Sequence, residues 1–283
     1  MMLEIMLTII ALTGLLIASY TDLKSREVPD WLSYGILSSA LGIRLIFSLN
    51  GNWNILFSGL FGFGVLFAVG YLFYIVSQWG GGDAKLLMGM GAVIGISLPF
   101  SALSLNVLWY FLALLLVGSI YGLAWMFFLM IKSWKEMSKP IITTLKKHNL
   151  LHIALSVITI FLFILTFFNK LFWPLVLFPL PLFYLFIAIN LVEEMNFYRR
   201  ISPLKLTEGD WLAEEVKANG KVLMEKKTVE KEDILKLRKW IGEKNIEKVL
   251  IKDGIPFIPS FLLAYFLFLF GEKIWSIVLN KLF

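Results

Sequence analysis

Long apolar runs are the feature that most constrains this chain. A helix needs about 20 apolar residues to cross roughly 30 Å of hydrocarbon. Eight runs come near that length: 3–20, 31–49, 55–76, 84–98, 107–131, 151–168, 172–192 and 255–270. The fourth and the eighth are the shortest, and the fourth is rich in glycine. This pattern predicts an α-helical polytopic membrane protein with about eight transmembrane helices, within a range of six to eight.

Composition agrees with a membrane protein and excludes several other classes. Hydrophobic residues make up 59% of the chain, charged residues 16%, and the mean hydropathy is high. The sequence has no cysteine, so a disulfide scaffold, thiolate chemistry and cysteine zinc sites are excluded. The segment 193–254 is almost balanced, with fourteen Lys/Arg and thirteen Asp/Glu, which leaves most of the net charge of +6 in the apolar part and its short loops. That distribution indicates a lipid bilayer as partner rather than nucleic acid.

The basic residues also predict an orientation. When the spans are threaded alternately, one side receives the segment 193–254 and most of the loop lysines and arginines. By the positive-inside rule the amino terminus lies outside, and the loops at 21–30, 78–84, 132–150 and 193–254 face the cytoplasm. Arg44 is expected to extend toward the outer surface. The span ends carry Trp31, Trp53, Trp79 and Trp173, as an aromatic belt requires.

The polar segment 193–254 reads as a small α/β module. Its patterns predict a helix over 209–218, a strand over 221–225, a second helix over 231–244 and a second strand over 247–252. The domain organisation expected is therefore a membrane core at 1–192, a cytoplasmic module at 193–254, and a carboxyl-terminal membrane helix with its tail at 255–283.

Acidic residues are rare in the first 131 positions, so each needs an explanation. Asp22 closes the first span, where a carboxylate opposes the helix dipole and does not stabilise its own helix; a solvated loop acid is the alternative interpretation. Asp30 follows Pro29 at the start of the second span, and we expect it to be an N-cap.

Asp83 follows three consecutive glycines, Gly80 to Gly82, which permit unusual backbone conformations and close approach of another chain. A flexible turn with a capping aspartate is the alternative interpretation. A phosphate-binding loop is not favoured, because the Gly-Lys-Ser/Thr pattern is absent and no soluble strand precedes the glycines. If a helix begins at Asp83, Lys85 points about 200° away around its axis, so the two do not pair within the helix.

Small residues indicate which helix faces pack closely beside the two aspartates. Gly14, Ala18 and Asp22 share one helix face, and Gly91 and Gly95 form a Gly-x-x-x-Gly pair after Asp83. Such faces let membrane helices approach closely, so both aspartates are expected together at one membrane boundary. Two carboxylates in a partly dry site tend to hold one proton between them, giving a base and an acid. Hydrolysis of a peptide bond by an activated water needs such a pair.

These motifs resemble those of a known protein family. Asp22 with Val28-Pro29-Asp30, followed by Gly80-Gly81-Gly82-Asp83-Ala84-Lys85-Leu86, resembles the Gly-x-Gly-Asp membrane aspartyl peptidases of the type IV prepilin peptidase family, especially its archaeal preflagellin and prepilin peptidases. The likeness covers roughly residues 14 to 95. A second patch, over 209–215 and 251–260, is similar to the carboxyl-terminal part of archaeal members.

The resemblance implies an aspartic endopeptidase that removes class III signal peptides from pilin-like or archaellin precursors at the cytoplasmic face of the cell membrane. It places the catalytic residues at Asp22 and Asp83, within a catalytic part at 1–100, and the supporting motif residues at Gly80, Gly82 and Lys85. Neither a cofactor nor a metal is expected. The resemblance does not determine the oligomeric state or the preferred precursor.

Two other classes of function remain as alternatives. A proton- or cation-coupled transporter would use the same two aspartates, but it predicts acids near the bilayer midplane rather than at span ends. A non-enzymatic scaffold would explain the segment 193–254 but not the contexts of the aspartates. His148 and His152 have the i, i+4 spacing of a metal site, yet no acid or cysteine nearby completes it, so we interpret them as interfacial residues.

Overall fold

The computed structural model describes residues 1–76, 78–99, 106–218, 221–244 and 246–282, with the side chains of 138–139, 242–244 and 272–282 left undescribed. The chain divides into two compact units, one formed by 1–122 with 254–283 and the other by 123–253. Each unit is described by itself.

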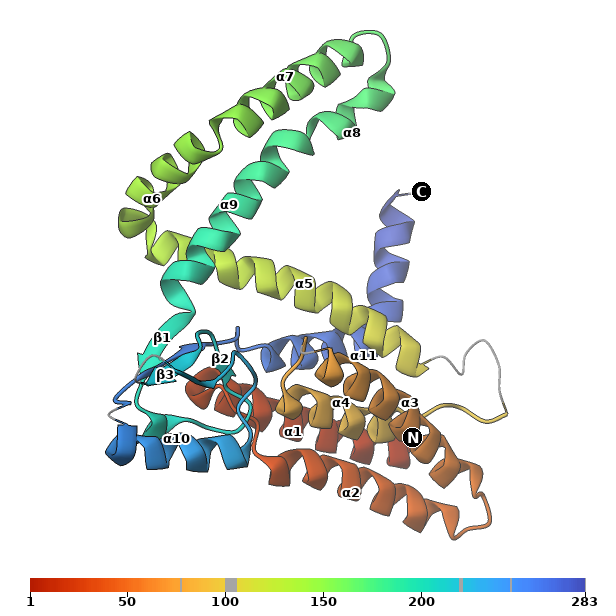
Figure 1. Cartoon of the computed structure of the whole chain (residues 1–283). Coiled ribbons are helices and arrows are strands. Elements are labelled where there is room, and N and C mark those ends of the chain that lie inside the picture. Colours follow the sequence, from red (N-terminus) through yellow and green to blue (C-terminus); the bar gives the residue numbers. More distant parts are fainter. Residues whose placement is uncertain (77, 100–105, 219–220, 245, 283) are drawn as a thin grey trace. The chain divides into compact units, whose positions relative to one another are not determined.

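The first unit is a helical bundle (Figure 1). It contains α1 (Met2–Ser25), α2 (Asp30–Ser48), α3 (Asn54–Ile75), α4 (Gly81–Ile94), the first part of α5 (Asn106–Lys132) and α11 (Ile258–Leu282). α1 packs against α2 and α11, while α4 packs against both α2 and α3. The core between these helices is apolar, with large buried side chains such as Leu15, Leu66, Met90 and Phe261.

Among the described residues, six helical segments are long and apolar enough to cross a membrane. They are α1, α2, α3, α5, α7 (Asn149–Thr166) and the stretch Lys170–Asn196. The run predicted over 84–98 forms the 14-residue α4, which at 1.5 Å per residue is about 21 Å long and too short to span the hydrocarbon. The last predicted run gives a shorter apolar segment, Ile258–Gly271, within α11. The chain is therefore a multi-pass helical membrane protein, and the six candidate spans among its described residues fall within the predicted range of six to eight.

Glycines bring α3 and α4 into backbone contact. A Cβ atom added at Gly62 would lie 2.2 Å from the carbonyl oxygen of Gly91, and one added at Gly91 would lie 2.4 Å from that of Gly62. Gly95 ends α4 with a φ of 69°, a conformation that favours glycine. The prediction of close packing after Asp83 is confirmed, but Gly95 terminates the helix instead of continuing its face.

Arg44 was expected to extend its side chain toward the outer surface, but the side chain is buried against the same end of α4. The Nε and Nη2 of Arg44 donate hydrogen bonds to the carbonyl oxygens of three residues at the end of α4: Ala92 (2.8 Å), Val93 (2.8 Å) and Ile94 (3.2 Å). Carbonyls in the last turn of a helix have no intrahelical partner. A buried guanidinium satisfies them here, which lets a short helix end inside the bundle.

The second unit begins with a helical hairpin (Figure 1). It contains the end of α5, then α6 (Trp134–Lys147), α7, the short η2 (Lys170–Phe172), α8 (Trp173–Val176) and α9 (Pro179–Asn196). The segment 132–150 was predicted to be a loop, but most of it is the amphipathic helix α6. Its buried Met137 joins a small apolar cluster with Phe183 and Ile187 of α9, and packing of this apolar face explains why a polar segment folds as a helix.

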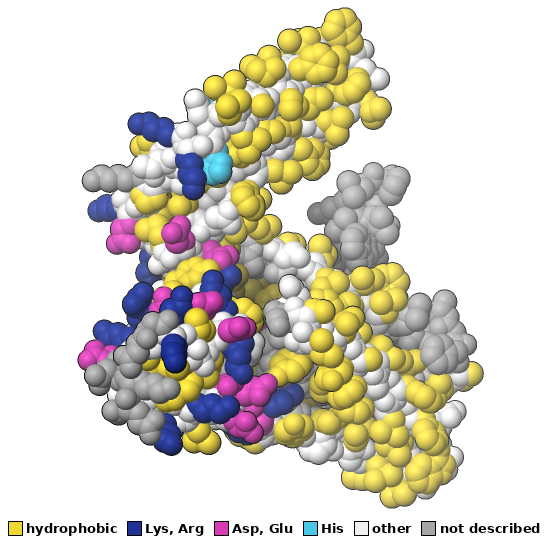
Figure 2. All heavy atoms as spheres, in the orientation of Figure 1, with side chains coloured by type: hydrophobic (Ala, Val, Ile, Leu, Met, Phe, Trp, Pro, Cys, Tyr) yellow, Lys and Arg dark blue, Asp and Glu magenta, His cyan; other side chains and the backbone are white. Residues whose placement is uncertain are grey.

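The α/β module follows in the same unit. Its elements are β1 (Tyr198–Ile201), η3 (Pro203–Lys205), β2 (Trp211–Leu212), β3 (Val216–Ala218), β4 (Lys221–Met224), α10 (Lys231–Lys244) and β5 (Val249–Lys252). β5 pairs antiparallel with both β1 and β2, and β3 pairs antiparallel with β4. Charged side chains gather over these elements in the space-filling view, in contrast to the apolar helices (Figure 2).

The module confirms part of the predicted pattern. The helix over 231–244 and the strands near 221–225 and 247–252 are present, but the helix predicted over 209–218 is wrong and β1 was missed. Gly209 has a φ of 102°, and the Asp210 carboxylate accepts a hydrogen bond from the Thr207 backbone N–H, so this stretch begins as a turn. Leu212 then pairs with Ile251 of β5. α10 covers the strands with Ile234 and Leu237, which join the buried cluster beneath it.

Candidate functional site

Asp22 lies near the carboxyl-terminal end of α1 with its side chain buried, at 7% exposure. Its Oδ2 accepts a hydrogen bond of 2.9 Å from the backbone N–H of Ile258, the first residue of α11. α1 ends three residues later, at Ser25, and Arg26 caps it in the left-handed conformation with a φ of 61°. Asp22 therefore meets the amino terminus of a neighbouring helix, which accounts for an acid at the unfavourable end of its own helix.

Asp83 lies in the first turn of α4, which begins at Gly81 with Gly80 as its N-cap. Its Oδ2 accepts a hydrogen bond of 3.2 Å from the Gly80 backbone N–H. This is the reciprocal half of a capping box, in which a side chain at the third helical position satisfies the free N–H of the N-cap residue. Asp83 therefore caps α4, as the alternative interpretation expected, but it does so from the third helical position and not as the N-cap residue.

The two carboxyl groups lie within electrostatic reach of each other, because the charge of Asp22 acts on Asp83. Their helices, α1 and α4, are in contact within the first unit. The Tyr121 hydroxyl of α5 is also within electrostatic reach of Asp22 and Arg26. Nothing in the sequence distinguished Tyr121 from the other aromatic residues of its apolar span, so only the structure adds it to the neighbourhood of the site.

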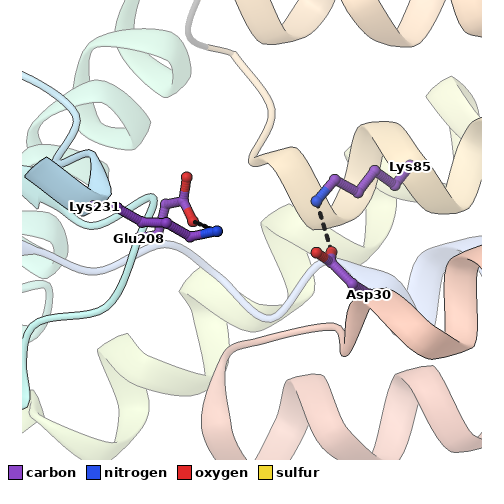
Figure 3. Close-up of polar contacts among 4 residues, drawn as sticks. All are labelled: Asp30, Lys85, Glu208 and Lys231. Atoms are coloured by element: carbon purple, nitrogen blue, oxygen red, sulfur yellow. Dashed lines mark hydrogen bonds and ion pairs between the residues drawn. The ribbon is translucent and has the colours of Figure 1, made fainter.

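Lys85 does not pair with Asp83, in agreement with the expected helical geometry. Its side chain reaches Asp30 of α2 (Figure 3). The distance between Nζ and Oδ1 of Asp30 is 2.6 Å, and Nζ also lies over the ring of Tyr34. Asp30 was expected to be an N-cap, but Pro29 occupies that position and no side chain caps the helix. The Asp30 carboxylate binds the lysine instead, so the two motifs are connected by an ion pair between α2 and α4.

The glycines before Asp83 let another segment come close. A Cβ added at Gly82 would lie 3.2 Å from the Cβ of Val28, in the loop between α1 and α2. At Gly80 the nearest atom to an added Cβ is the Asp83 carboxylate, at 3.6 Å. Gly82 therefore has a steric reason to be small, whereas Gly80 contributes through its backbone N–H.

Trp79 was expected in an aromatic belt at the membrane surface, but it is partly buried within the bundle. Its ring lies 4.7 Å from that of Phe73 and within 6 Å of those of Phe257 and Phe261, measured between centroids. The residue directly before the glycines is thus held by aromatic contacts with α3 and with the start of α11.

The described residues contain no group of three His or acidic side chains able to hold a metal ion. His148 is the N-cap of α7, and Nε2 of His152 lies 2.7 Å from the Tyr184 hydroxyl. The interpretation of these histidines as interfacial residues is compatible with that contact.

Comparison with known proteins identifies the region that carries the two aspartates. Residues 9–127 match the type IV leader peptidase family. This region includes most of α1 and α5 and all of α2 to α4, and with them Asp22, Asp83 and the ion pair between Asp30 and Lys85. The resemblance to this family is confirmed, and the matches give no support to an ion-coupled transporter.

Curated relatives are similar over a shorter stretch. The chain is 42% identical over 87 residues to a preflagellin peptidase of Methanococcus voltae, covering 30% of this chain and 36% of the relative. It is 40% identical over 88 residues to a preflagellin peptidase of Methanocaldococcus jannaschii, covering 30% and 37%. A prepilin peptidase EppA of Methanothermobacter thermautotrophicus is 29% identical over 97 residues, covering 33% and 25%.

The matched stretch thus spans only about a third of the first two relatives. No solved structure matches this chain.

Proposed function

We propose that this chain is a membrane aspartic endopeptidase that cleaves the signal peptides of archaellin or pilin-like precursors. The observation that carries the proposal is that Asp22 lies close enough for its charge to act on Asp83, within the region that matches the leader peptidases. The similarity to archaeal preflagellin peptidases supports the substrate class. The segments 21–30 and 78–84 would face the cytoplasm, where a positively charged leader would be presented.

In this mechanism one aspartate removes a proton from water, which attacks the scissile carbonyl carbon. The other donates its proton to the nitrogen of the departing amine, and no covalent intermediate with the enzyme forms. Gly80 and Gly82 would keep Asp83 at the start of α4, and Lys85 would hold α4 beside α2 through Asp30. The membrane core at 1–192, with its catalytic part at 1–100, would bind the hydrophobic helix of the precursor.

The test is cleavage of an archaeal preflagellin and, separately, a prepilin by the purified full-length chain in liposomes. The amino-terminal sequence of each product shows whether the leader has been removed. We expect Asp22→Asn and Asp83→Asn each to lower kcat by at least about 100-fold, as loss of a general acid or base does. Glu27→Gln is the matched control, because Glu27 is an exposed acid in the loop after α1. Cleavage by either aspartate variant at the control rate would show that the dyad is wrongly assigned.

A further inference from the structure

The start of α11 contacts the candidate active site from a distant part of the chain. Ile258 donates its backbone N–H to Asp22, although 236 positions separate the two residues in the sequence. Both residues are buried, with exposures of 0% for Ile258 and 7% for Asp22. Ile258 also lies outside the matched region, which ends at residue 127.

This contact suits an ionised carboxylate. The first N–H groups of a helix have no partner within the helix and carry partial positive charge. A carboxylate that accepts one of them forms a charge-assisted hydrogen bond. At the carboxyl-terminal end of α1, Asp22 faces the negative end of its own helix dipole. The amino terminus of α11 therefore stabilises the negative charge of Asp22, which the carboxyl terminus of α1 does not.

Other contacts fix the segment that leads into α11. The Arg26 guanidinium, which follows α1, donates a hydrogen bond to the Gly254 carbonyl oxygen. The ring of Phe257 lies against Gly118 of α5, where an added Cβ would be 2.7 Å from its Cζ. The same ring is 5.9 Å from that of Trp79, which directly precedes the glycines before Asp83. Residues 254–258 thus contact the end of α1 and, through Trp79, the segment that directly precedes the helix of the second aspartate.

We propose that residues 254–258 are a positioning element of the aspartate dyad, with the Ile258 N–H holding the Asp22 carboxylate in place and favouring its ionised form. This inference rests on the proposed peptidase function. It extends the active site beyond the matched region, because the site is incomplete without the start of α11. The Ile258 amide acts through Asp22 and does not itself touch the peptide bond.

A proline at position 258 tests the hydrogen bond directly. Proline has no N–H and is tolerated at the first helical position, because the amide there makes no intrahelical bond. Ile258→Pro should therefore remove the donor without breaking α11. Ile258→Ala is the matched comparison, because it also loses the buried side chain but keeps the N–H. The ratio between the two variants isolates the hydrogen bond from the loss of packing.

With a precursor that the wild type cleaves, we expect kcat of Ile258→Pro to be at least about tenfold below that of Ile258→Ala, with a similar KM. The acidic limb of its pH–rate profile should lie about one pH unit higher, because a carboxylate that loses a donor needs a higher pH to ionise. Equal kcat values and superimposable pH profiles for the two variants would overturn the inference.

A second readout does not depend on cleavage. Dicyclohexylcarbodiimide reacts with protonated carboxyl groups in apolar surroundings, and mass spectrometry measures its labelling of Asp22 as a function of pH. We expect labelling in Ile258→Pro to persist to a higher pH than in Ile258→Ala. If the wild type cleaves no precursor, the proposed function fails while this labelling still decides the inference. Identical labelling profiles would contradict the inference whether or not the chain is a peptidase.

Discussion

Both aspartates receive a hydrogen bond from a backbone N–H at the start of a helix. Asp83 accepts from Gly80 at the start of its own helix, and Asp22 accepts from Ile258 at the start of a different one. A backbone donor stays in place as long as the helix begins at the same residue. The geometry of the two carboxyl groups is therefore set by where α4 and α11 begin, rather than by flexible basic side chains.

The ion pair between Lys85 and Asp30 can be tested by exchanging its charges. Both side chains are partly exposed, at 34% and 63%, so we expect each of Lys85→Asp and Asp30→Lys to lower the free energy of unfolding by up to about 1 kcal/mol. The double variant should recover most of the loss. Thermal unfolding in detergent measures all three, and additive effects in the double variant would show that the two residues are not coupled.

At the scale of elements, the contact between α3 and α4 sets how closely Asp83 can approach the rest of the bundle. The backbones meet at Gly62 and Gly91, where neither helix has space for a side chain. Lipid is as apolar as the helix surfaces, so close backbone packing rather than the hydrophobic effect has to hold such helices together.

Gly62→Ala should separate the two helices, because its Cβ would lie 2.2 Å from the Gly91 carbonyl oxygen. We expect a loss of about 1–3 kcal/mol in the free energy of unfolding, the usual cost of overpacking. Gly64→Ala is the matched control in the same helix, since nothing lies within 4 Å of an added Cβ there. Unfolding midpoints in detergent compare the two, and equal midpoints would contradict the close packing.

The end of α4 provides a separate test. Arg44→Met removes the donors to the carbonyl oxygens of Ala92, Val93 and Ile94. Each buried acceptor left without a partner costs roughly 1–3 kcal/mol, so we expect little folded protein after purification. Arg44→Lys keeps the charge and some donors and should fold partially. Size-exclusion chromatography of the two variants measures the folded fraction, and a monodisperse, stable Arg44→Met would exclude this role.

At the scale of the whole molecule, the two units differ in what stabilises them. The first unit depends on apolar and glycine contacts between helices, whereas the module in the second carries ion pairs on a small apolar core. Figure 3 shows one exposed pair of the module, Lys231 with Glu208. Acid should therefore destabilise the module before it affects the helices of the first unit.

Asp233 is the residue at which this pH effect can be measured. Burial of Asp233 raises its pKa, but hydrogen bonds from the Lys227 side chain and the Glu230 backbone N–H outweigh burial and place the pKa below its ordinary value of 3.8. The stabilisation is complete above the unfolded pKa and is lost as the pH falls through the lower folded pKa. We expect α10 to lose about 1 kcal/mol of stability below about pH 4, comparable to the loss of a helix cap.

Hydrogen exchange of α10 in the full-length chain, corrected for the intrinsic pH dependence of exchange, measures this loss. Asp233→Asn should weaken α10 at neutral pH and flatten its dependence on acid. Glu232→Gln, a change in a neighbouring exposed acid, should keep the wild-type profile. An unchanged profile in Asp233→Asn would show that this carboxylate does not stabilise the module.

Long apolar runs predicted the helices of the membrane region well, because each run has to satisfy its backbone hydrogen bonds internally whatever surrounds it. The same local signals failed at 209–218, where pairing of Leu212 with β5 decides the structure. They also failed at Arg44, because the sequence around an arginine near a span end does not show that another helix, α4, ends beside it. Both errors concern partners that are distant in sequence.

The sequence alone determined that this chain is a helical membrane protein, and its two acidic motifs indicated which family it resembles. Rare charges in apolar surroundings need a reason, so Asp22 and Asp83 could be selected without a structure. The contact of Asp83 with the Gly80 amide is local, whereas only the tertiary structure decided that the Ile258 amide holds Asp22. The physical reason is that every residue except proline carries a backbone N–H, and only the packing of α11 against α1 brings that of Ile258 to Asp22.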